Sequence, residues 1–127
     1  LLFVVLLLAC DKSTTEPEPT PILITTGFSG YDTVRTLQHR VTPYFDLTSF
    51  SSLRFTWVCV DPGSLTLSIG TPDGGFANSL FSENPGSSKS YTVTALPHQI
   101  PNRDNVRFRM SLGGSGYATN FKLEGFK

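Results

Sequence analysis

The chain has few of the side chains that ordinarily carry out chemistry. Its 127 residues include only two cysteines, Cys10 and Cys59. The two histidines, His39 and His98, stand far apart and form no HExxH or cysteine–histidine metal spacing. The segment Gly113–Tyr117 ends in tyrosine where a Gly-x-Ser-x-Gly nucleophile motif needs glycine. The sequence therefore predicts no catalytic residue, no metal site and no cofactor.

Charge and helix-forming residues are also scarce. The formal net charge is +0 and 16% of residues are charged, so no basic surface for nucleic acid is indicated. Helix formers are sparse after residue 22, and Met110 is the only methionine. Phenylalanine, threonine, serine, glycine and proline are plentiful by comparison. This composition favours strands joined by turns.

The chain opens on an apolar run, residues 1–9, that stops at Cys10. The run is shorter than the roughly 20 residues that a membrane-spanning helix needs, but it has the length of a signal-peptide core. We expect a signal peptide over 1–9 that is truncated at its start, because no methionine or basic residue precedes it. A plain secretory signal and a transmembrane helix cut short are the alternatives.

The last residues of this run, Leu7-Leu8-Ala9-Cys10, resemble the bacterial lipobox. The resemblance implies cleavage before Cys10 and a diacylglyceryl thioether on its sulfur, which would hold the protein on a membrane. Residues 11–21, DKSTTEPEPTP, contain no apolar side chain and three prolines. We therefore expect residues 10–21 to be a lipidated cysteine followed by a disordered tether, extending roughly 30 Å if it is polyproline-like.

Residues 22–127 are expected to form one all-β domain. Apolar and polar residues alternate with a period of two in several segments, and DPG, TPDGG and GGSG mark turns between them. In LRFTWVCV the alternation places Trp57 and Cys59 on one face, where Cys59 is expected to be a small buried hydrophobe. The other alternating segments are SLTLSIG, SYTVTAL, VRFRMSL and NFKLEGF. This pattern predicts an antiparallel β-sandwich.

Three stretches resemble the jelly-roll modules of the MAM and carbohydrate-binding type. They are TPYFDLTSFSSLRFTW, LTLSIGTPDGG and VRFRMSLGGSGYATNFKLEGF. The resemblance implies a jelly-roll-like sandwich. It differs from true MAM domains, which carry paired cysteines, because Cys59 is the only cysteine after residue 22.

Ligand-binding candidates are the aromatic side chains outside the alternation and two arginines. Sugar-binding sandwiches of the resembled type stack exposed aromatic faces on pyranose rings and bond hydroxyls with polar side chains. The candidates are Tyr31, Tyr44, Phe76, Tyr117, Asn120, Arg107 and Arg109, with Arg54 as a possible addition to the arginine stripe. Aromatic residues that anchor loops, and a solvated arginine face, are the alternatives.

These features predict a lipid-anchored binding module of a bacterial cell envelope, facing the periplasm or the exterior. The expected ligand is a surface glycan or polysaccharide, and no catalysis is expected. The alternative is a structural or protein-interaction subunit of an envelope complex. A hydrolase is disfavoured, because no nucleophile and base can be paired from the sequence.

Overall fold

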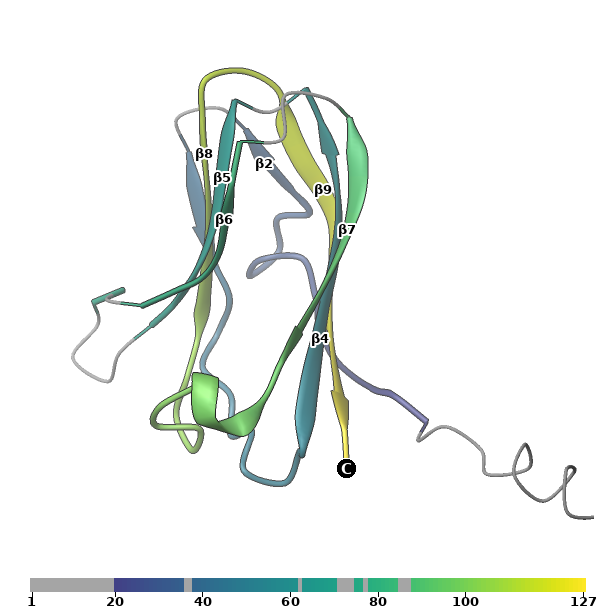
Figure 1. Cartoon of the computed structure of the whole chain (residues 1–127), viewed down its shortest axis with the longest axis vertical. Coiled ribbons are helices and arrows are strands. Elements are labelled where there is room, and N and C mark those ends of the chain that lie inside the picture. The colour runs from purple at the N-terminus through teal and green to yellow at the C-terminus, as the bar shows by residue number, and fades with distance from the viewer. Residues whose placement is uncertain (1–19, 36–37, 62, 71–74, 77, 85–87) are drawn as a thin grey trace, which may run out of the picture.

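The computed structural model describes residues 20–127, apart from 36–37, 62, 71–74, 77 and 85–87. In this part of the chain two antiparallel sheets pack face to face (Figure 1). The signal peptide and tether expected over residues 1–19 lie outside the described residues. The described strands are β1 (Ile22–Thr26), β2 (Thr33–Arg35), β3 (His39–Val41), β4 (Ser52–Val60), β5 (Ser64–Ile69), β6 (Asn78–Glu83), β7 (Lys89–Ala95), β8 (Phe108–Gly113) and β9 (Tyr117–Phe126), with a short 3₁₀ turn at Pro97–Gln99.

The strand order is that of a jelly roll. One sheet has the order β1-β9-β4-β7, with β2 also pairing with β9, and the other has the order β3-β8-β5-β6. Successive strands cross repeatedly between the two sheets, so that β4 and β9 lie in one layer while β5 and β8 lie in the other. This is the double Greek-key arrangement of jelly rolls. The prediction of an all-β, jelly-roll-like antiparallel sandwich is confirmed.

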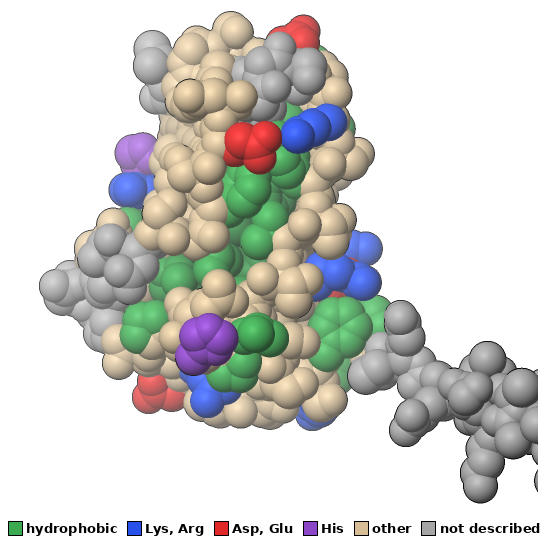
Figure 2. Space-filling model, in the orientation of Figure 1, with side chains coloured by type: hydrophobic (Ala, Val, Ile, Leu, Met, Phe, Trp, Pro, Cys, Tyr) green, Lys and Arg blue, Asp and Glu red, His purple; other side chains and the backbone are tan. Residues whose placement is uncertain are grey.

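The core lies between the sheets and follows the predicted alternation. Along β4 the burial alternates residue by residue, and Phe55, Trp57 and Cys59 are 0–1% exposed. Phe55 packs edge-on against Phe108 of the facing sheet, with ring centroids 4.9 Å apart. Burying each large apolar side chain contributes about 1.5–3 kcal/mol, so this layer supplies most of the favourable free energy. Figure 2 shows hydrophobic side chains reaching the surface in the opening between the two layers.

Some local predictions need correction. The alternating segment that was expected to begin at Val106 enters regular pairing only at Phe108, because Val106 forms an isolated bridge with Phe45. The strands over 33–35 and 39–41 gave no alternation in the sequence, since three residues are too few to show a period.

None of the described helices is long and apolar enough to cross a membrane.

Candidate functional site

A groove crosses the outer face of the β1-β9-β4-β7 sheet. Its volume is about 840 Å³, and it is open to solvent. We call it the outer-face groove. The residues that line it are Thr26, Gly27, Gly30, Tyr31, Asp32, Thr56, Trp57, Val58, Ser90, Tyr91, Thr92, Asn120, Phe121 and Lys122.

A row of polar side chains forms the floor of the outer-face groove. Thr26 of β1 is the register partner of Lys122 of β9, which is also the partner of Thr56 of β4, and Thr56 is opposite Thr92 of β7. Neighbouring strands lie about 4.8 Å apart, so the row spans the sheet as four adjacent positions on one face. Three hydroxyls and one ammonium group are therefore presented side by side.

A tight turn between β1 and β2 places Tyr31 at the rim of the groove. Phe28 and Tyr31 pair across it, the Phe28 amide donating to the Tyr31 carbonyl at 2.6 Å and the Tyr31 amide to the Phe28 carbonyl at 3.0 Å. The two central residues, Ser29 and Gly30, have φ values of 49° and 94°, as a type I′ turn requires. Phe28 is buried against Phe121, with ring centroids 4.3 Å apart. Because Phe28 is anchored in the core, the turn holds Tyr31 in a defined position at the rim of the groove.

The ring of Tyr31 is oriented by an arginine and remains accessible. Arg40 of β3 lies over the ring, with its Cζ 3.9 Å from the ring centroid. Tyr31 is nevertheless 54% exposed, the second-highest exposure among the large hydrophobic residues of the described chain. A cation–π contact of this kind contributes about 0.5–1 kcal/mol at exposed sites and limits the rotation of the ring. Tyr31 therefore presents a held aromatic surface beside the polar floor.

A β-bulge in β9 directs Asn120 into the groove. Thr56 pairs with Lys122 but Val58 pairs with Thr119, so β9 carries one residue more than β4 at this point. Asn120 adopts the left-handed conformation with φ 57° and is exposed at the groove wall. Asparagine tolerates this conformation better than other residues with a side chain, and bulges often re-aim side chains near functional sites. The bulge thus adds an amide to the floor's hydroxyls.

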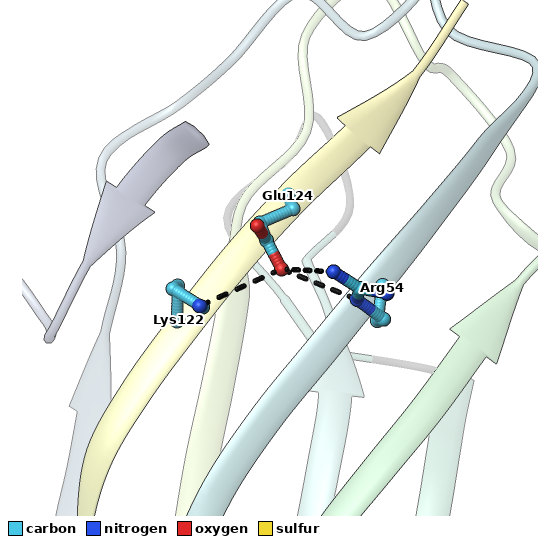
Figure 3. Close-up of polar contacts among 3 residues, drawn as sticks. All are labelled: Arg54, Lys122 and Glu124. Carbon is cyan, nitrogen blue, oxygen red and sulfur yellow. Dashed lines mark hydrogen bonds and ion pairs between the residues drawn. The ribbon is translucent and has the colours of Figure 1, made fainter. Parts of the chain in front are cut away.

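Lys122 shares a carboxylate with Arg54 (Figure 3). The Oε1 atom of Glu124 accepts from Arg54 Nη2 at 2.8 Å and Nε at 3.2 Å, and Lys122 Nζ lies 3.7 Å from the same oxygen. Glu124 lies on the outer face of the sheet, yet it is only 8% exposed. Because Arg54 holds the nearer position, the ammonium of Lys122 is only weakly held and stays beside the groove.

The predicted ligand-binding residues separate into two groups on opposite sheets. Tyr31 and Asn120 line the outer-face groove. Arg107 and Arg109 lie on the outer face of the other sheet. Their ring partners there are Tyr44 and Phe76.

Two further candidates are placed elsewhere. Tyr117 lies at the start of β9, where Arg35 sits over its ring, and it does not line the groove. The idea that Arg54 extends the arginine stripe is wrong. Arg54 belongs to β4 in the opposite sheet, where it pairs with Glu124.

Sequence reasoning missed most of the groove floor. Thr56 and Lys122 fall on the polar side of alternating segments, but nothing in the sequence says that they become neighbours. Thr26 and Thr92 complete the row only through the strand register. Strand alternation fixes faces, whereas adjacency depends on the topology.

The remaining reactive groups lie away from the groove. Cys59 is 0% exposed, and burial raises the pKa of its thiol above the ordinary value, which keeps it protonated and unreactive. This confirms its expected role as a small buried hydrophobe. His39 and His98 are exposed. Among the described residues no group of histidine, cysteine, aspartate and glutamate is placed to hold a metal ion.

Comparison with known proteins gives similarity at the level of architecture. No protein-family model matches the chain, and no curated protein matches it. Among solved structures, the CBM22-1 xylan-binding domain of Xyn10C from Paenibacillus barcinonensis matches with a TM-score of 0.49 at 7% identity, over 87% of this chain and 99% of that one. The C-terminal CBM6 of LamC, a marine laminarinase from Zobellia galactanivorans, matches with a TM-score of 0.46 at 11% identity, over 85% and 99%.

Larger enzymes match as well. The family GH115 4-O-methyl-α-glucuronidase BtGH115A, with specificity for decorated arabinogalactans, gives a TM-score of 0.48 at 5% identity. That match covers 87% of this chain, which spans only 16% of the length of the enzyme. All three scores lie below 0.5. The strand order identifies the fold as a jelly roll.

Proposed function

We propose that this protein is a non-catalytic carbohydrate-binding module that holds a glycan chain in the outer-face groove. The observation that carries the proposal is the combination of an exposed, oriented aromatic ring with a row of hydroxyl, amide and ammonium groups on one rigid sheet. Tyr31 supplies the ring, and Thr56, Thr92, Asn120 and Lys122 supply the polar groups.

This combination suits the chemistry of sugars. A pyranose ring has an apolar face that packs on an aromatic side chain, and its rim of hydroxyls both donates and accepts hydrogen bonds. The groove offers both hydrogen-bond donors and hydrogen-bond acceptors. The threonine hydroxyls and the Asn120 amide can donate and accept, and the Lys122 ammonium donates. Its volume of about 840 Å³ lies within the usual range for ligand sites.

The carboxylates near the groove support binding without hydrolysis. Glycosidases of the usual kinds need two carboxyl groups on either side of the scissile bond. Of the described residues that line the groove, Asp32 is the one with a carboxylate. The nearby Glu124 is largely buried and is engaged by Arg54 at 2.8 Å. Among the described residues, the groove therefore presents groups suited to holding a sugar chain and no second carboxylate opposite Asp32.

Calorimetric titration with a panel of neutral polysaccharides tests this proposal. We expect at least one neutral polymer to bind and the Tyr31→Ala variant to bind it about tenfold more weakly, as for an exposed aromatic anchor. Asn120→Gly should also weaken binding, because it removes the amide and keeps the backbone conformation. Both residues are exposed, so neither change is expected to unfold the protein.

The matched control is Tyr44→Ala, which removes an exposed tyrosine from the opposite sheet. It should leave the affinity for neutral polymers unchanged. If no neutral polymer binds, or if Tyr44→Ala weakens binding as much as Tyr31→Ala, the groove is not a glycan site. A protein that then co-purifies with the chain from envelope extracts would favour an interaction role instead.

We also propose that the module is displayed from a bacterial membrane by lipid on Cys10. The support is the lipobox-like Leu7-Leu8-Ala9-Cys10 and the proline-rich stretch that follows it. Two or three acyl chains hold a protein firmly, because each buried CH₂ contributes about 0.8 kcal/mol. A tethered module of this kind would keep its groove in contact with polymers at the cell surface.

A further inference from the structure

A lysine occupies the middle of the groove floor. Lys122 of β9 is the register partner of Thr26 of β1 on one side and of Thr56 of β4 on the other, so a threonine flanks it in each neighbouring strand. Lys122 lines the outer-face groove, and its side chain is 45% exposed. A glycan that crosses the floor would therefore pass within reach of this ammonium group.

The carboxylate beside Lys122 is already engaged by another cation. Arg54 donates to Oε1 of Glu124 from Nη2 at 2.8 Å and from Nε at 3.2 Å (Figure 3). The Nζ atom of Lys122 lies 3.7 Å from the same oxygen, which is longer than the roughly 3.2 Å that an N–H···O hydrogen bond spans. One carboxylate thus faces two cations, and one positive charge of the three groups stays uncompensated.

The second carboxylate near the floor does not compensate this charge. Asp32 lines the groove next to the rim turn, and its Oδ1 accepts a hydrogen bond from Thr33 Oγ1 at 3.3 Å. Within the described part of the chain, no ion pair includes Asp32, and Glu124 is the one carboxylate within ion-pair distance of Lys122. The groove therefore holds a cation at its floor that an anionic ligand group would complement.

The geometry points to a glycan that carries carboxylate groups as the ligand of the outer-face groove, that is, a polysaccharide that contains uronic acids. This inference rests on the proposed function and names the class of polymer. The carboxylate would pair with the Lys122 ammonium on the side away from Glu124, and the hydroxyls of Thr26 and Thr56 would donate to it from the flanking strands. Tyr31 would pack against a sugar of the same chain.

The charge of the site favours a carboxylate over a phosphate. A carboxylate carries one negative charge, which matches the one positive charge that Glu124 leaves uncompensated. A phosphate monoester carries about −1.5 to −2 at neutral pH, and the surplus would be repelled by the carboxylates of Glu124 and Asp32. A sulfate ester also carries a single charge, so dextran sulfate belongs among the probes.

Calorimetric titration of the 127-residue chain tests the inference. The probes are polygalacturonate, polymannuronate and polyglucuronate, each paired with its methyl ester, which keeps the sugar backbone and removes the charge. We expect at least one of the three to bind about fivefold more tightly than its own ester at low salt, as a partly exposed ion pair allows. The preference should shrink as salt is added, because salt screens exposed charges.

Substitution of Lys122 locates the preference. Lys122→Gln should bind the acidic polymer no more tightly than its ester. Lys122→Arg should keep the preference, since arginine keeps the positive charge. Neither change is expected to unfold the protein, because Arg54 still holds Glu124 at 2.8 Å.

The matched control is Lys89→Gln. Lys89 lies on β7 of the same sheet, its side chain is 47% exposed, and it is also paired with a glutamate, Glu83. It does not line the groove, so its replacement should leave the preference for the acidic polymer unchanged.

Four results would overturn the inference. They are polyuronates that bind no more tightly than their esters, a preference that survives in Lys122→Gln, an equal loss of the preference in Lys89→Gln, and dextran sulfate that binds as tightly as the best polyuronate. The last result would show a site that responds to negative charge of any kind and not to carboxylates.

Failure of this inference can be told apart from failure of the proposed function. A neutral polymer that binds wild-type protein and is lost in Tyr31→Ala, with no preference for uronates, would leave the groove a glycan site and reject only the acidic ligand. Absence of binding by every polymer, neutral or acidic, would reject both.

Discussion

At the scale of single residues, Asn120 shows how one backbone conformation creates a site. The left-handed φ of 57° lets β9 accommodate an extra residue opposite β4 and turns a polar side chain toward the groove. Residues branched at Cβ strongly disfavour this region, because their side chains meet the backbone carbonyl oxygen. The backbone at this position therefore restricts which residues can stand there.

Two substitutions at Asn120 separate these roles. Asn120→Gly should leave the free energy of unfolding within about 0.5 kcal/mol of the parent, since glycine adopts positive φ without strain. Asn120→Val should lower it by about 1–2 kcal/mol. Chemical denaturation followed by the fluorescence of Trp57 measures both, and the two should bind glycan equally poorly. Equal stabilities would mean that the bulge relaxes, and the strain argument would fail.

The burial of some residues could be predicted from the sequence, whereas the placement of others at the candidate site could not, for a physical reason. Trp57 and Cys59 were predicted to be buried because alternation reports which face of a strand is apolar. Asn120 was chosen only for its place near a loop, and nothing in a single sequence signals the bulge that aims it. Tyr31 and Tyr44 were both chosen as exposed aromatics, but their assignment to different sheets required the chain path.

At the scale of secondary-structure elements, the pairing of β4 with β9 carries both packing and charge. Glu124 of β9 faces Arg54 of β4 directly in the register, and its carboxylate is also the nearest anion to Lys122. The side chain of Glu124 is only 10% exposed, so the ion pair is partly shielded from water. An opposite charge at this place prevents two neighbouring cations from repelling each other on adjacent strands.

Removal of the Glu124 carboxylate should lower the free energy of unfolding more than removal of an exposed carboxylate. We expect Glu124→Ala to lower the free energy of unfolding by about 1–3 kcal/mol, since it leaves Arg54 and Lys122 without their shared partner. Glu83→Ala is the matched control. This variant breaks the ion pair between Glu83 and Lys89, whose side chains are 40% and 47% exposed. It should lower the free energy of unfolding by less than about 1 kcal/mol. Urea denaturation of both variants measures the difference, and equal losses would contradict the role of burial.

The short elements explain why topology was harder to predict than fold class. Long strands such as β4 and β9 show their alternation plainly, and they suffice to predict a sandwich. The strands β2 and β3, each of three residues, owe their conformation to the longer strands β9 and β8 with which they pair. Their formation is a tertiary effect, so local sequence carries little of it.

At the scale of the whole molecule, the two sheets give the domain two independent outer surfaces. The groove on one side presents a ring with uncharged and weakly held polar groups, and the opposite side presents stacked arginines. A closed core separates them, so a ligand on one face does not exclude a ligand on the other.

The described chain enters the sandwich at one end of the first sheet. Ile22, the first residue of β1, pairs with Gly125 near the C-terminal end of β9, so the tether expected before residue 22 would join the domain at that end (Figure 1). The outer faces of the two sheets run along the strands, and neither face lies at the end where the chain enters. Under the proposed membrane display, a domain held by its N-terminal end would keep the outer-face groove open to polymers beside it.

Replacement of the proposed anchor residue should free the module without changing its binding. Cys10→Ser removes the thiol to which a diacylglyceryl group would be attached. Without acyl chains, the protein loses the membrane-binding free energy of about 0.8 kcal/mol per buried CH₂. In the native host we expect wild-type protein in the membrane fraction with a mass increased by lipid, and Cys10→Ser in the soluble fraction with no such increase. Both forms should bind polysaccharide equally, because the described residues that line the groove lie between Thr26 and Lys122. Wild-type protein that stays in the membrane without lipid mass would show that another segment anchors it.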